Sequence, residues 1–274
     1  MLDAPARYRC TVCRDRGWIV SRAPDDGLDS GSARPCDCRG RQRGERLLEE
    51  TGIPERYRQC TLENFLVADG GVAGEELVRA RATCQSYVEG FLASDGTFCQ
   101  SGLLFVGRVG VGKTHLAVAV LRELVRRFGL PGRFVDFTTL VHRMQVSFDP
   151  TSEESRRQLL DPLGSVDVLV LDELGAQKPT PFVRDLLYLI VNTRYARRLP
   201  TLFTTNFALE APSARPQRSL DRAADPPDDA AIAVTLEQRI GAPLLSRLFE
   251  MARPVLLDSV RDYRREIRMH QLRT

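Results

Sequence analysis

One eight-residue stretch constrains the fold of this chain more than any other: Gly107–Thr114, which reads G-x-x-x-x-G-K-T. This is the Walker A pattern of a phosphate-binding loop, with every defining position present. The preceding residues, 101–106, form a short apolar run of buried-strand length, and residues 115–128 place apolar side chains at helical spacing. A strand, a glycine loop and a helix in this order are the context that the pattern requires. We therefore expect an α/β domain that binds a nucleotide.

The residue types of this loop suit a phosphate chain. Glycines let the backbone curl so that several N–H groups point at phosphate oxygens, and the following helix adds about half a positive charge at its N-terminus. Lys113 is expected to reach the β- and γ-phosphates, and the Thr114 hydroxyl to bind Mg²⁺. Only two of the 39 basic residues are lysines, Lys113 and Lys178, so a chain that otherwise uses arginine has a compact ammonium here. The predicted nucleotide contacts are Gly107, Arg108, Val109, Gly110, Val111, Gly112, Lys113, Thr114 and His115.

An acidic pair follows a second buried strand about sixty residues later. The run 166–171 is almost continuously apolar, as a parallel strand covered on both faces requires, and it ends in Asp172-Glu173. We interpret this as a Walker B pair, in which Asp172 supports the Mg²⁺ and Glu173 is the base that polarises the attacking water. A further strand at 201–203 leads to Asn206, which is either a turn former or a sensor beside the γ-phosphate. Strands alternating with helices predict a doubly wound parallel sheet with its ligand at the carboxyl ends of the strands.

Two pairs of cysteines open the chain. Cys10 and Cys13 form a C-x-x-C pair, and Cys36 and Cys38 form a tighter C-x-C pair. Four thiolates in this arrangement would complete a tetrahedral zinc site, and the metal would supply folding energy to a segment with little core of its own. A redox pair and plain reduced thiols are the alternatives. We expect zinc as a structural ion.

The chain divides into three parts on composition. Residues 1–50 form the cysteine-rich segment, 51–73 a linker and 74–274 the nucleotide-binding domain. Within the last, 211–233 combine prolines and charges without apolar periodicity, which predicts a disordered insertion. The arginine-rich stretch 34–58 predicts a short helix that either joins the two parts or contacts nucleic acid or a partner.

Composition excludes several classes of protein. No apolar run approaches the roughly 20 residues needed to span a bilayer, and the first residues lack the apolar core of a signal peptide. We therefore expect a cytoplasmic protein without membrane contact, whose cysteines stay reduced or bind metal. The net charge is only +3, so a nucleic-acid surface must be a local patch.

Several segments together resemble the DnaC/DnaI-like helicase loaders, an AAA+ branch that includes the IstB-type transposition helpers. The N-terminal cysteine pairs also look like the zinc-bearing version of this family. The resemblance runs from Cys10 to about Arg268, interrupted by the insertion. Its segments are Gly52–Tyr57 before Phe65, Leu104–Leu116, Val170–Gly175, Arg194-Tyr195, Pro200-Thr201, Thr204–Asn206, Arg239–Gly241 and Ser246–Met251.

The resemblance implies an AAA+ sheet with a reduced lid, ATP with Mg²⁺, and assembly into a spiral of subunits. It makes Arg247 the arginine finger that reaches a neighbour's ATP, and Arg264, or else Arg261, the sensor II arginine. Single-stranded DNA would contact Arg143, Thr180 and Phe182, although a Phe at this position also suits a buried helix cap. The cysteine segment would dock on the hexameric DnaB-type replicative helicase.

Three functions follow from these observations. The first is an ATP-hydrolysing loader that delivers a DnaB-type helicase onto single-stranded DNA. The second is an IstB-type transposition helper acting on duplex DNA, and the third is a nucleotide-gated adaptor without hydrolysis. The cysteine pairs favour loading, and the set of Glu173, Asn206 and Arg247 argues against a pure adaptor, which needs no complete hydrolysis machinery.

Overall fold

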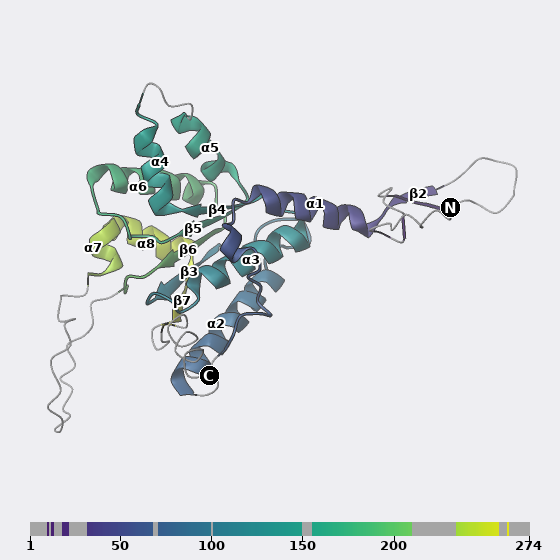
Figure 1. Ribbon diagram of the computed structural model, residues 1–274, viewed down its shortest axis with the longest axis horizontal. Coiled ribbons are helices and arrows are strands. Elements are labelled where there is room, and N and C mark those ends of the chain that lie inside the picture. The colour runs from purple at the N-terminus through teal and green to yellow at the C-terminus, as the bar shows by residue number, and fades with distance from the viewer. Residues whose placement is uncertain are drawn as a thin grey trace, which may run out of the picture.

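A five-stranded parallel sheet forms the centre of the computed structural model (Figure 1). The structure describes residues 10, 12–13, 18–21, 32–67, 71–99, 101–149, 155–209, 234–257 and 262. Because every pair of neighbouring strands is parallel, the carboxyl ends of all five lie at one edge of the sheet. In spatial order the strands are β4 (Gly132–Asp136), β5 (Val168–Asp172), β6 (Thr201–Thr205), β3 (Gly102–Gly107) and β7 (Arg253–Leu257). The predicted parallel α/β sheet is thus confirmed.

Helices cover both faces of this sheet (Figure 1). One face carries α2 and α3 together with the segment that precedes them, and the other carries α4 to α8. The helices are α1 (Asp37–Glu50), the 3₁₀ turn η1 (Glu55–Tyr57), α2 (Gly71–Glu89), α3 (Lys113–Phe128), α4 (Phe137–Val146), α5 (Arg156–Ser165), α6 (Pro181–Ala196), α7 (Leu236–Ile240) and α8 (Ala242–Met251).

The two cores take alternate residues of the strands. Leu103 and Phe105 of β3 belong to the core under α2 and α3, whereas Leu104 and Val106 belong to the core under α4 to α8. All four side chains are at most 1% exposed. Each such side chain stabilises the fold by roughly 1.5–3 kcal/mol through its removal from water. The continuous apolar runs of the sequence therefore reflect a sheet that is covered on both faces.

Two element boundaries differ from the sequence expectation for identifiable reasons. The apolar side chains of 133–137 predict a strand that ends at Phe137. Phe137 instead begins α4, because Asp136 caps this helix by accepting a hydrogen bond from the Thr139 N–H at 2.7 Å. β6 extends to Thr205 rather than Phe203, because Thr204 and Thr205 are fully buried strand residues whose hydroxyls bond to the neighbouring strand and loop.

A buried arginine fixes the opposite edge of the sheet. Arg194 of α6 is 0% exposed, and its guanidinium donates to five acceptors. Four are backbone carbonyls around the amino ends of β5 and β6, and the fifth is the hydroxyl of Thr201. Since a buried charge needs its hydrogen bonds satisfied, this one side chain holds α6 to both strands.

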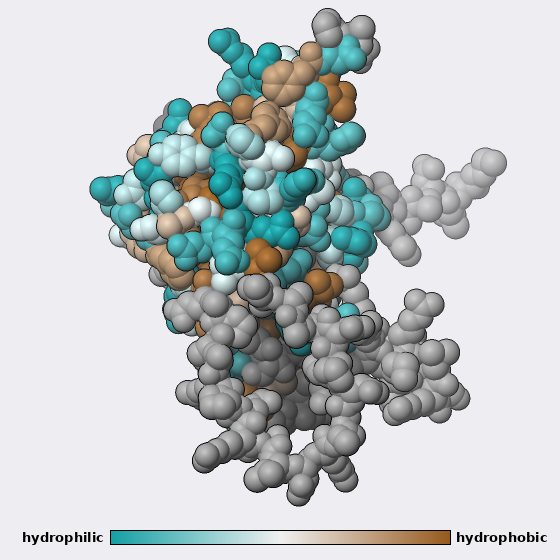
Figure 2. Space-filling view, turned by 90° about the vertical axis from the view of Figure 1, so that its left-hand side faces the viewer, coloured by the Kyte–Doolittle hydropathy of each residue, from teal (hydrophilic) through white to brown (hydrophobic). Residues whose placement is uncertain are grey.

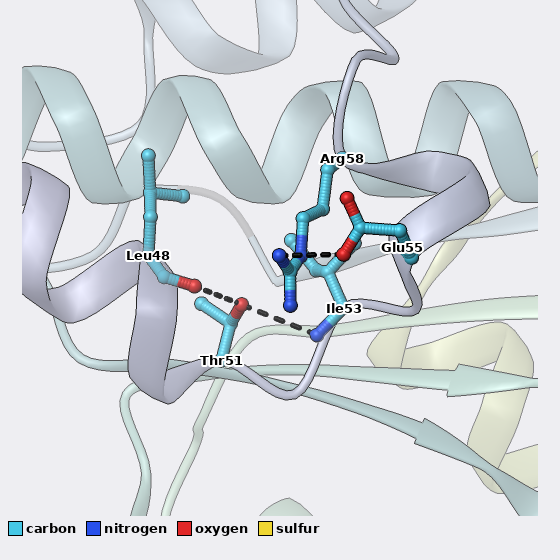
Figure 3. Close-up of polar contacts among 5 residues, drawn as sticks. All are labelled: Leu48, Thr51, Ile53, Glu55 and Arg58. Carbon is cyan, nitrogen blue, oxygen red and sulfur yellow. Dashed lines mark hydrogen bonds and ion pairs between the residues drawn. The ribbon is translucent and has the colours of Figure 1, made fainter.

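The residues after α1 pack onto the domain, although the sequence suggests a linker over 51–73. Thr51 closes the helix by donating to the Leu48 carbonyl at 2.6 Å, and its own hydroxyl accepts from the Ile53 N–H (Figure 3). The Thr51 carbonyl accepts from the Phe134 N–H at 2.7 Å, which joins the segment to the edge strand β4. Ile53, Cys60, Leu62 and Phe65 then enter the core beside α3.

The helix α1 carries the N-terminal segment away from the sheet (Figure 1). It packs on α3 and β4 at its C-terminal half, and the small antiparallel pair β1 (Trp18–Ser21) and β2 (Ser32–Pro35) lies at its other end. The sequence also predicts a basic helix over 259–272. This segment and the expected insertion 211–233 fall outside the described residues, apart from Asp262. Within the described part of the chain, no helix is both long and apolar enough to cross a bilayer.

Candidate functional site

The phosphate loop joins β3 to α3 at the carboxyl edge of the sheet. Gly110 and Gly112 adopt left-handed backbone angles, with φ of +84° and +96°, and Gly112 directly precedes the first turn of α3. A side chain at Gly110 would overlap that of Asp262, so Asp262 lies against the loop. The Lys113 side chain is 6% exposed and donates to the carbonyls of Gly107 and Arg108 at 2.7 and 2.6 Å. The ammonium thus lies inside the curl of the loop, where a phosphate chain would be bound.

One carboxylate oxygen connects the loop to two other strands. Asp172 Oδ1, at the end of β5, accepts from the Thr114 hydroxyl at 3.0 Å and from the Thr204 hydroxyl of β6 at 2.6 Å. The Thr204 hydroxyl also accepts from the Glu173 N–H at 3.0 Å. This chain of hydrogen bonds places Thr114, Asp172 and Glu173 in one constellation, although 58 residues separate the first two.

Burial and neighbouring acidic side chains raise the pKa of Asp172 and of Glu173. The pKa of Asp172 is above its usual value because the carboxyl is buried and because Asp136, at the end of β4, is close. Burial likewise raises the pKa of Glu173, and the charges of Asp136 and Asp172 add to the effect, whereas Arg56 and Lys113 oppose it. A carboxyl group with a raised pKa is a better proton acceptor, which suits a general base.

Glu173 also has a strained backbone. Its φ is +59°, in the left-handed region that a residue with a side chain rarely adopts. Such a conformation costs of order 1–3 kcal/mol and is found mainly where the surrounding structure imposes it, often in active sites. Here the Glu173 N–H is bonded to Thr204, and the Leu174 N–H donates to the Thr204 carbonyl at 2.8 Å. The adjacent strand thus holds the turn that presents the carboxylate.

The segment after α1 contacts the start of α3. His115 Nε2 donates to the Thr61 carbonyl at 2.9 Å, and the His115 ring meets the Phe65 ring edge-on at 5.3 Å between centroids. The Phe65 ring also fills the space beside Gly112, where an added Cβ would come within 2.7 Å of its Cε2 atom. Burial lowers the pKa of His115. The His115 side chain therefore binds this segment rather than pointing into the loop.

The site has the donors that Mg²⁺ and a nucleotide require. Mg²⁺ prefers hard oxygen ligands, and the Thr114 hydroxyl and the Asp172 carboxylate supply them 3.0 Å apart. The glycine loop and the helix N-terminus supply backbone N–H groups for phosphate oxygens. Asn206 follows β6, between β3 and β5 in the sheet, and its side chain is exposed at the same edge. The glycine loop, Thr114, Asp172 and Asn206 thus lie together at the carboxyl edge of the sheet, where the sequence predicts the ligand.

The predicted arginine finger, Arg247, does not lie beside the phosphate loop of its own chain. Arg247 of α8 stacks on the ring of Tyr188 of α6, with its guanidinium carbon 4.7 Å from the ring centroid. A second arginine of this region, Arg239, stacks in the same way on Phe207 at 4.6 Å. Arg247 therefore packs on the helical layer and not on the loop of its own chain. Arg264 and Arg261 lie outside the described residues.

The residues predicted to contact DNA lie around the start of α6. The Thr180 hydroxyl caps this helix by accepting from the Val183 N–H, and Phe182 is half-buried. The Phe182 ring meets the ring of Phe148, which follows α4 and is 52% exposed, at 5.7 Å between centroids. Arg143, at the end of α4, is exposed. Thr180, not Phe182, thus caps the helix, and the DNA contact of Phe182 stays a prediction.

Three of the four predicted zinc ligands come together. The thiol sulfurs of Cys10, Cys13 and Cys36 all lie within 4.8 Å of one another, and those of Cys10 and Cys36 are 3.7 Å apart. The backbone N–H of Cys13 is the main cause that lowers the pKa of Cys10 to about 7, although the burial of the thiol opposes it. Cys36 is the residue before α1, and Cys38 lies in its first turn with a side chain outside the described part. The three clustered thiols fit a thiolate-bound Zn²⁺, which takes four Cys or His ligands in structural sites.

Two residues of the site escaped the sequence analysis. Asp136 adds a third carboxylate, and Thr204 connects Asp172 to Glu173. Asp136 stands between an apolar strand and a helix, which is the ordinary position of a helix cap, so its charge gave no separate signal. Thr204 is one of two adjacent threonines, and only the strand register shows which of them faces Asp172.

Comparison with known proteins agrees with this geometry. The family model described as IstB-like ATP binding protein matches residues 85–217. The replicative helicase loader DnaC of Escherichia coli strain K12 is 32% identical over 168 residues, which cover 61% of this chain and 63% of that protein. DnaC of Buchnera aphidicola subsp. Schizaphis graminum is 30% identical over 162 residues, 59% of this chain and 61% of that protein. The chain thus spans less than two thirds of the length of these relatives.

The fold and the site together define a AAA+ P-loop protein. A crystal structure of the DnaC helicase loader matches at 30% identity with a TM-score of 0.55, over 74% of this chain and 99% of that one. This chain belongs to the DnaC/DnaI-like family. A crystal structure of DnaI, at 23% identity and a TM-score of 0.54, covers 75% of this chain and 95% of that one and shows the same fold.

Proposed function

We propose that this protein binds and hydrolyses ATP at the carboxyl edge of its sheet. The backbone of the loop and Lys113 bind the phosphates, and Lys113 exchanges its two carbonyl contacts for phosphate oxygens. Thr114 and Asp172 hold Mg²⁺, which neutralises charge on the phosphates. Glu173 accepts the proton of the attacking water, and Asn206 orients that water. The observation that carries this proposal is the hydrogen-bonded set of Thr114, Asp172, Thr204 and Glu173.

Hydrolysis then depends on a second copy of the chain. Arg247 lies on the helical layer, so we assign it to the ATP of a neighbouring subunit in a spiral assembly. Such an arginine finger spreads the negative charge of the transition state and can increase the rate by roughly 10³–10⁵. We assign Arg264 to the nucleotide of its own subunit, and the contact of Asp262 with Gly110 supports a C-terminal segment beside the loop.

The biological role that we propose is the ATP-dependent delivery of a DnaB-type replicative helicase onto single-stranded DNA in the cytoplasm. Membership of the DnaC/DnaI-like family supports this role, since the curated relatives are named as replicative helicase loaders. The cysteine cluster, with Zn²⁺ bound, would form the docking segment for the helicase. Cys36 begins α1, which extends away from the sheet, so the cluster lies at the far end of this helix (Figure 1).

Single-stranded DNA is assigned to the aromatic pair beside α6. The Phe148 and Phe182 rings offer faces for base stacking, and Arg156 lies over the Phe148 ring at 4.5 Å. Aromatic rings beside cationic side chains are the common elements of such sites. Arg143 and Thr180 would contact the DNA backbone.

The test is co-purification with the replicative helicase of the source organism, with ATP and Mg²⁺ present. We expect a stable complex with the native chain and its loss in Cys10→Ser/Cys13→Ser. Lys113→Ala should abolish nucleotide binding but leave the purified protein folded. If the chain binds no helicase and is instead retained on duplex DNA, the loader assignment is wrong.

The alternative function is that of an IstB-type transposition helper, which the match to the IstB-like family model favours. Its ATP chemistry would be the same, so the duplex-DNA arm of the test separates the two. A non-hydrolysing adaptor is the third possibility. It predicts that Glu173→Gln leaves every function of the protein intact, whereas a loader should release its partner more slowly with this variant.

A further inference from the structure

Arg247 has an unusual environment for a surface arginine. Its Nη1 atom is buried and has no hydrogen-bond partner, and no carboxylate in the described part of the chain lies within ion-pair distance of its guanidinium. Its contact is instead the face of the Tyr188 ring, 4.7 Å from the guanidinium carbon.

The most obvious partner for Arg247 is already engaged. Glu250 lies three residues further along α8, a spacing at which an arginine and a glutamate commonly pair. Its carboxylate instead accepts a hydrogen bond from the Tyr195 hydroxyl at 2.8 Å. Tyr195 and Tyr188 both belong to α6, so one helix binds the acid and offers a ring to the arginine.

A carboxylate and an aromatic ring differ in whether they occupy the N–H donors of the arginine. A carboxylate would neutralise the guanidinium and use its N–H donors, which a phosphate would then have to displace. A stacked ring attracts the cation through its face and uses none of the in-plane donors. A guanidinium held in this way keeps its charge and its forked geometry for an incoming anion.

We propose that Tyr188 is a positioning residue for the arginine finger: its ring fixes Arg247 with its donors unoccupied, ready for the phosphates bound to a second copy of the chain. This inference rests on the proposed role of Arg247. Tyr188 is 42% exposed, and its α6 neighbour Leu189 is 51% exposed, so the pair stands on accessible surface. Figure 2 shows the left-hand side of the Figure 1 view, where apolar residues stand in patches among hydrophilic ones.

The experiment measures ATP hydrolysis as a function of protein concentration, so that kcat of the assembled form is obtained separately from assembly itself. The variants are Tyr188→Leu, which keeps an apolar side chain without a ring face, and Tyr188→Phe, which keeps the face. Leu189→Ala is the matched control, because it removes exposed apolar surface from the same helix without touching Arg247. Nucleotide affinity of the dilute protein and sedimentation with a non-hydrolysable ATP analogue are recorded for each.

The expected result is a roughly two- to thirty-fold lower kcat for Tyr188→Leu, since a cation–π contact contributes about 0.5–2 kcal/mol and about 1.4 kcal/mol corresponds to a factor of ten. Tyr188→Phe and Leu189→Ala should retain kcat, and all variants should bind nucleotide and sediment like the native protein. In an Arg247→Ala background, Tyr188→Leu should have no additional effect.

Two outcomes would overturn separate parts of the argument. If Arg247→Ala retains its concentration-dependent hydrolysis, the finger assignment itself is wrong. The second outcome is that Arg247→Ala loses this hydrolysis while Tyr188→Leu keeps native kcat, or that Tyr188→Phe is as impaired as Tyr188→Leu. In either case the finger assignment stands and the positioning role of Tyr188 is refuted.

Discussion

The contact between Phe65 and the phosphate loop allows a quantitative test with Gly112→Ala. The native φ of Gly112 is +96°, so an alanine would have a disfavoured backbone that costs about 1–2 kcal/mol. Its Cβ would also lie 2.7 Å from Phe65 Cε2, and inserting a methyl group into such a packed contact costs typically 1–3 kcal/mol. We expect the free energy of unfolding to fall by roughly 2–5 kcal/mol, as the sum of the two effects.

A matched control lies at the other end of the same helix. Gly129 follows α3 with a φ of +65°, and a Cβ added there would meet nothing within 4 Å. Gly129→Ala should therefore cost only the backbone part, about 1–2 kcal/mol. In a Phe65→Leu background, which removes the Cε2 atom, the cost of Gly112→Ala should fall toward that of the backbone alone.

Urea denaturation measures these differences, and titration with a fluorescent ATP analogue measures their effect on the site. Gly112→Ala should weaken nucleotide binding, because the displaced ring or the displaced loop disturbs the N–H groups that face the phosphates. Gly129→Ala should bind normally. If Gly112→Ala costs the same amount in the native chain and in the Phe65→Leu background, the ring and the loop are not in the contact described, and the reasoning fails.

Three further predictions concern other parts of the molecule. Asp136→Asn keeps the helix cap but removes a negative charge that raises the pKa of Glu173. The pKa of Glu173 should therefore fall, and the acid limb of the kcat–pH profile should move to lower pH. An unchanged profile would exclude Glu173 as the titrating base. Arg194→Met removes five hydrogen bonds of a buried side chain, four of them to backbone carbonyls, and should lower the unfolding free energy by about 3–5 kcal/mol in urea, against little change for exposed Arg197→Met. Phe182→Ala should weaken single-stranded DNA binding by about 1–3 kcal/mol in a filter-binding assay while ATP affinity is kept, and equal binding by Phe182→Ala and the native chain would remove the stacking role.

The sequence predicted the carboxyl edge of the sheet well because its signals are local. A glycine loop, an apolar strand ending in two acids and a polar strand end each describe one turn of chain, and the parallel topology brings them together. Asp172 and Thr114 meet because β5 and β3 end at the same edge, with β6 between them. No long-range information was needed for that step.

The sequence failed where the decisive contact joins distant residues that lack a characteristic pattern. The composition of residues 51–73 suggests a linker, yet Phe65 and Thr61 contact the first turn of α3. The role proposed for Tyr188 could not be predicted either, because a tyrosine on an exposed helix face indicates no function until the residue that packs on it is known. Such contacts depend on how helices pack, which composition and spacing do not determine.

The packing of α1 on α3 determines the direction in which the cysteine cluster faces. Gly44 lies so close to α3 that an added Cβ would come within 3.3 Å of the Arg126 Cα, so this point of α1 is fixed on the domain. Cys36 begins the same helix, and each residue between the two turns it by about 100° around the helix axis and moves it by about 1.5 Å. Removing one residue there would point the cluster toward a different side of the molecule, whereas inserting seven would restore its bearing to within about 20° and move it outward by about 10 Å. The direction in which the cluster faces thus depends on the fraction of a helical turn between Cys36 and Gly44. Its distance from the domain depends separately on the number of whole turns between them.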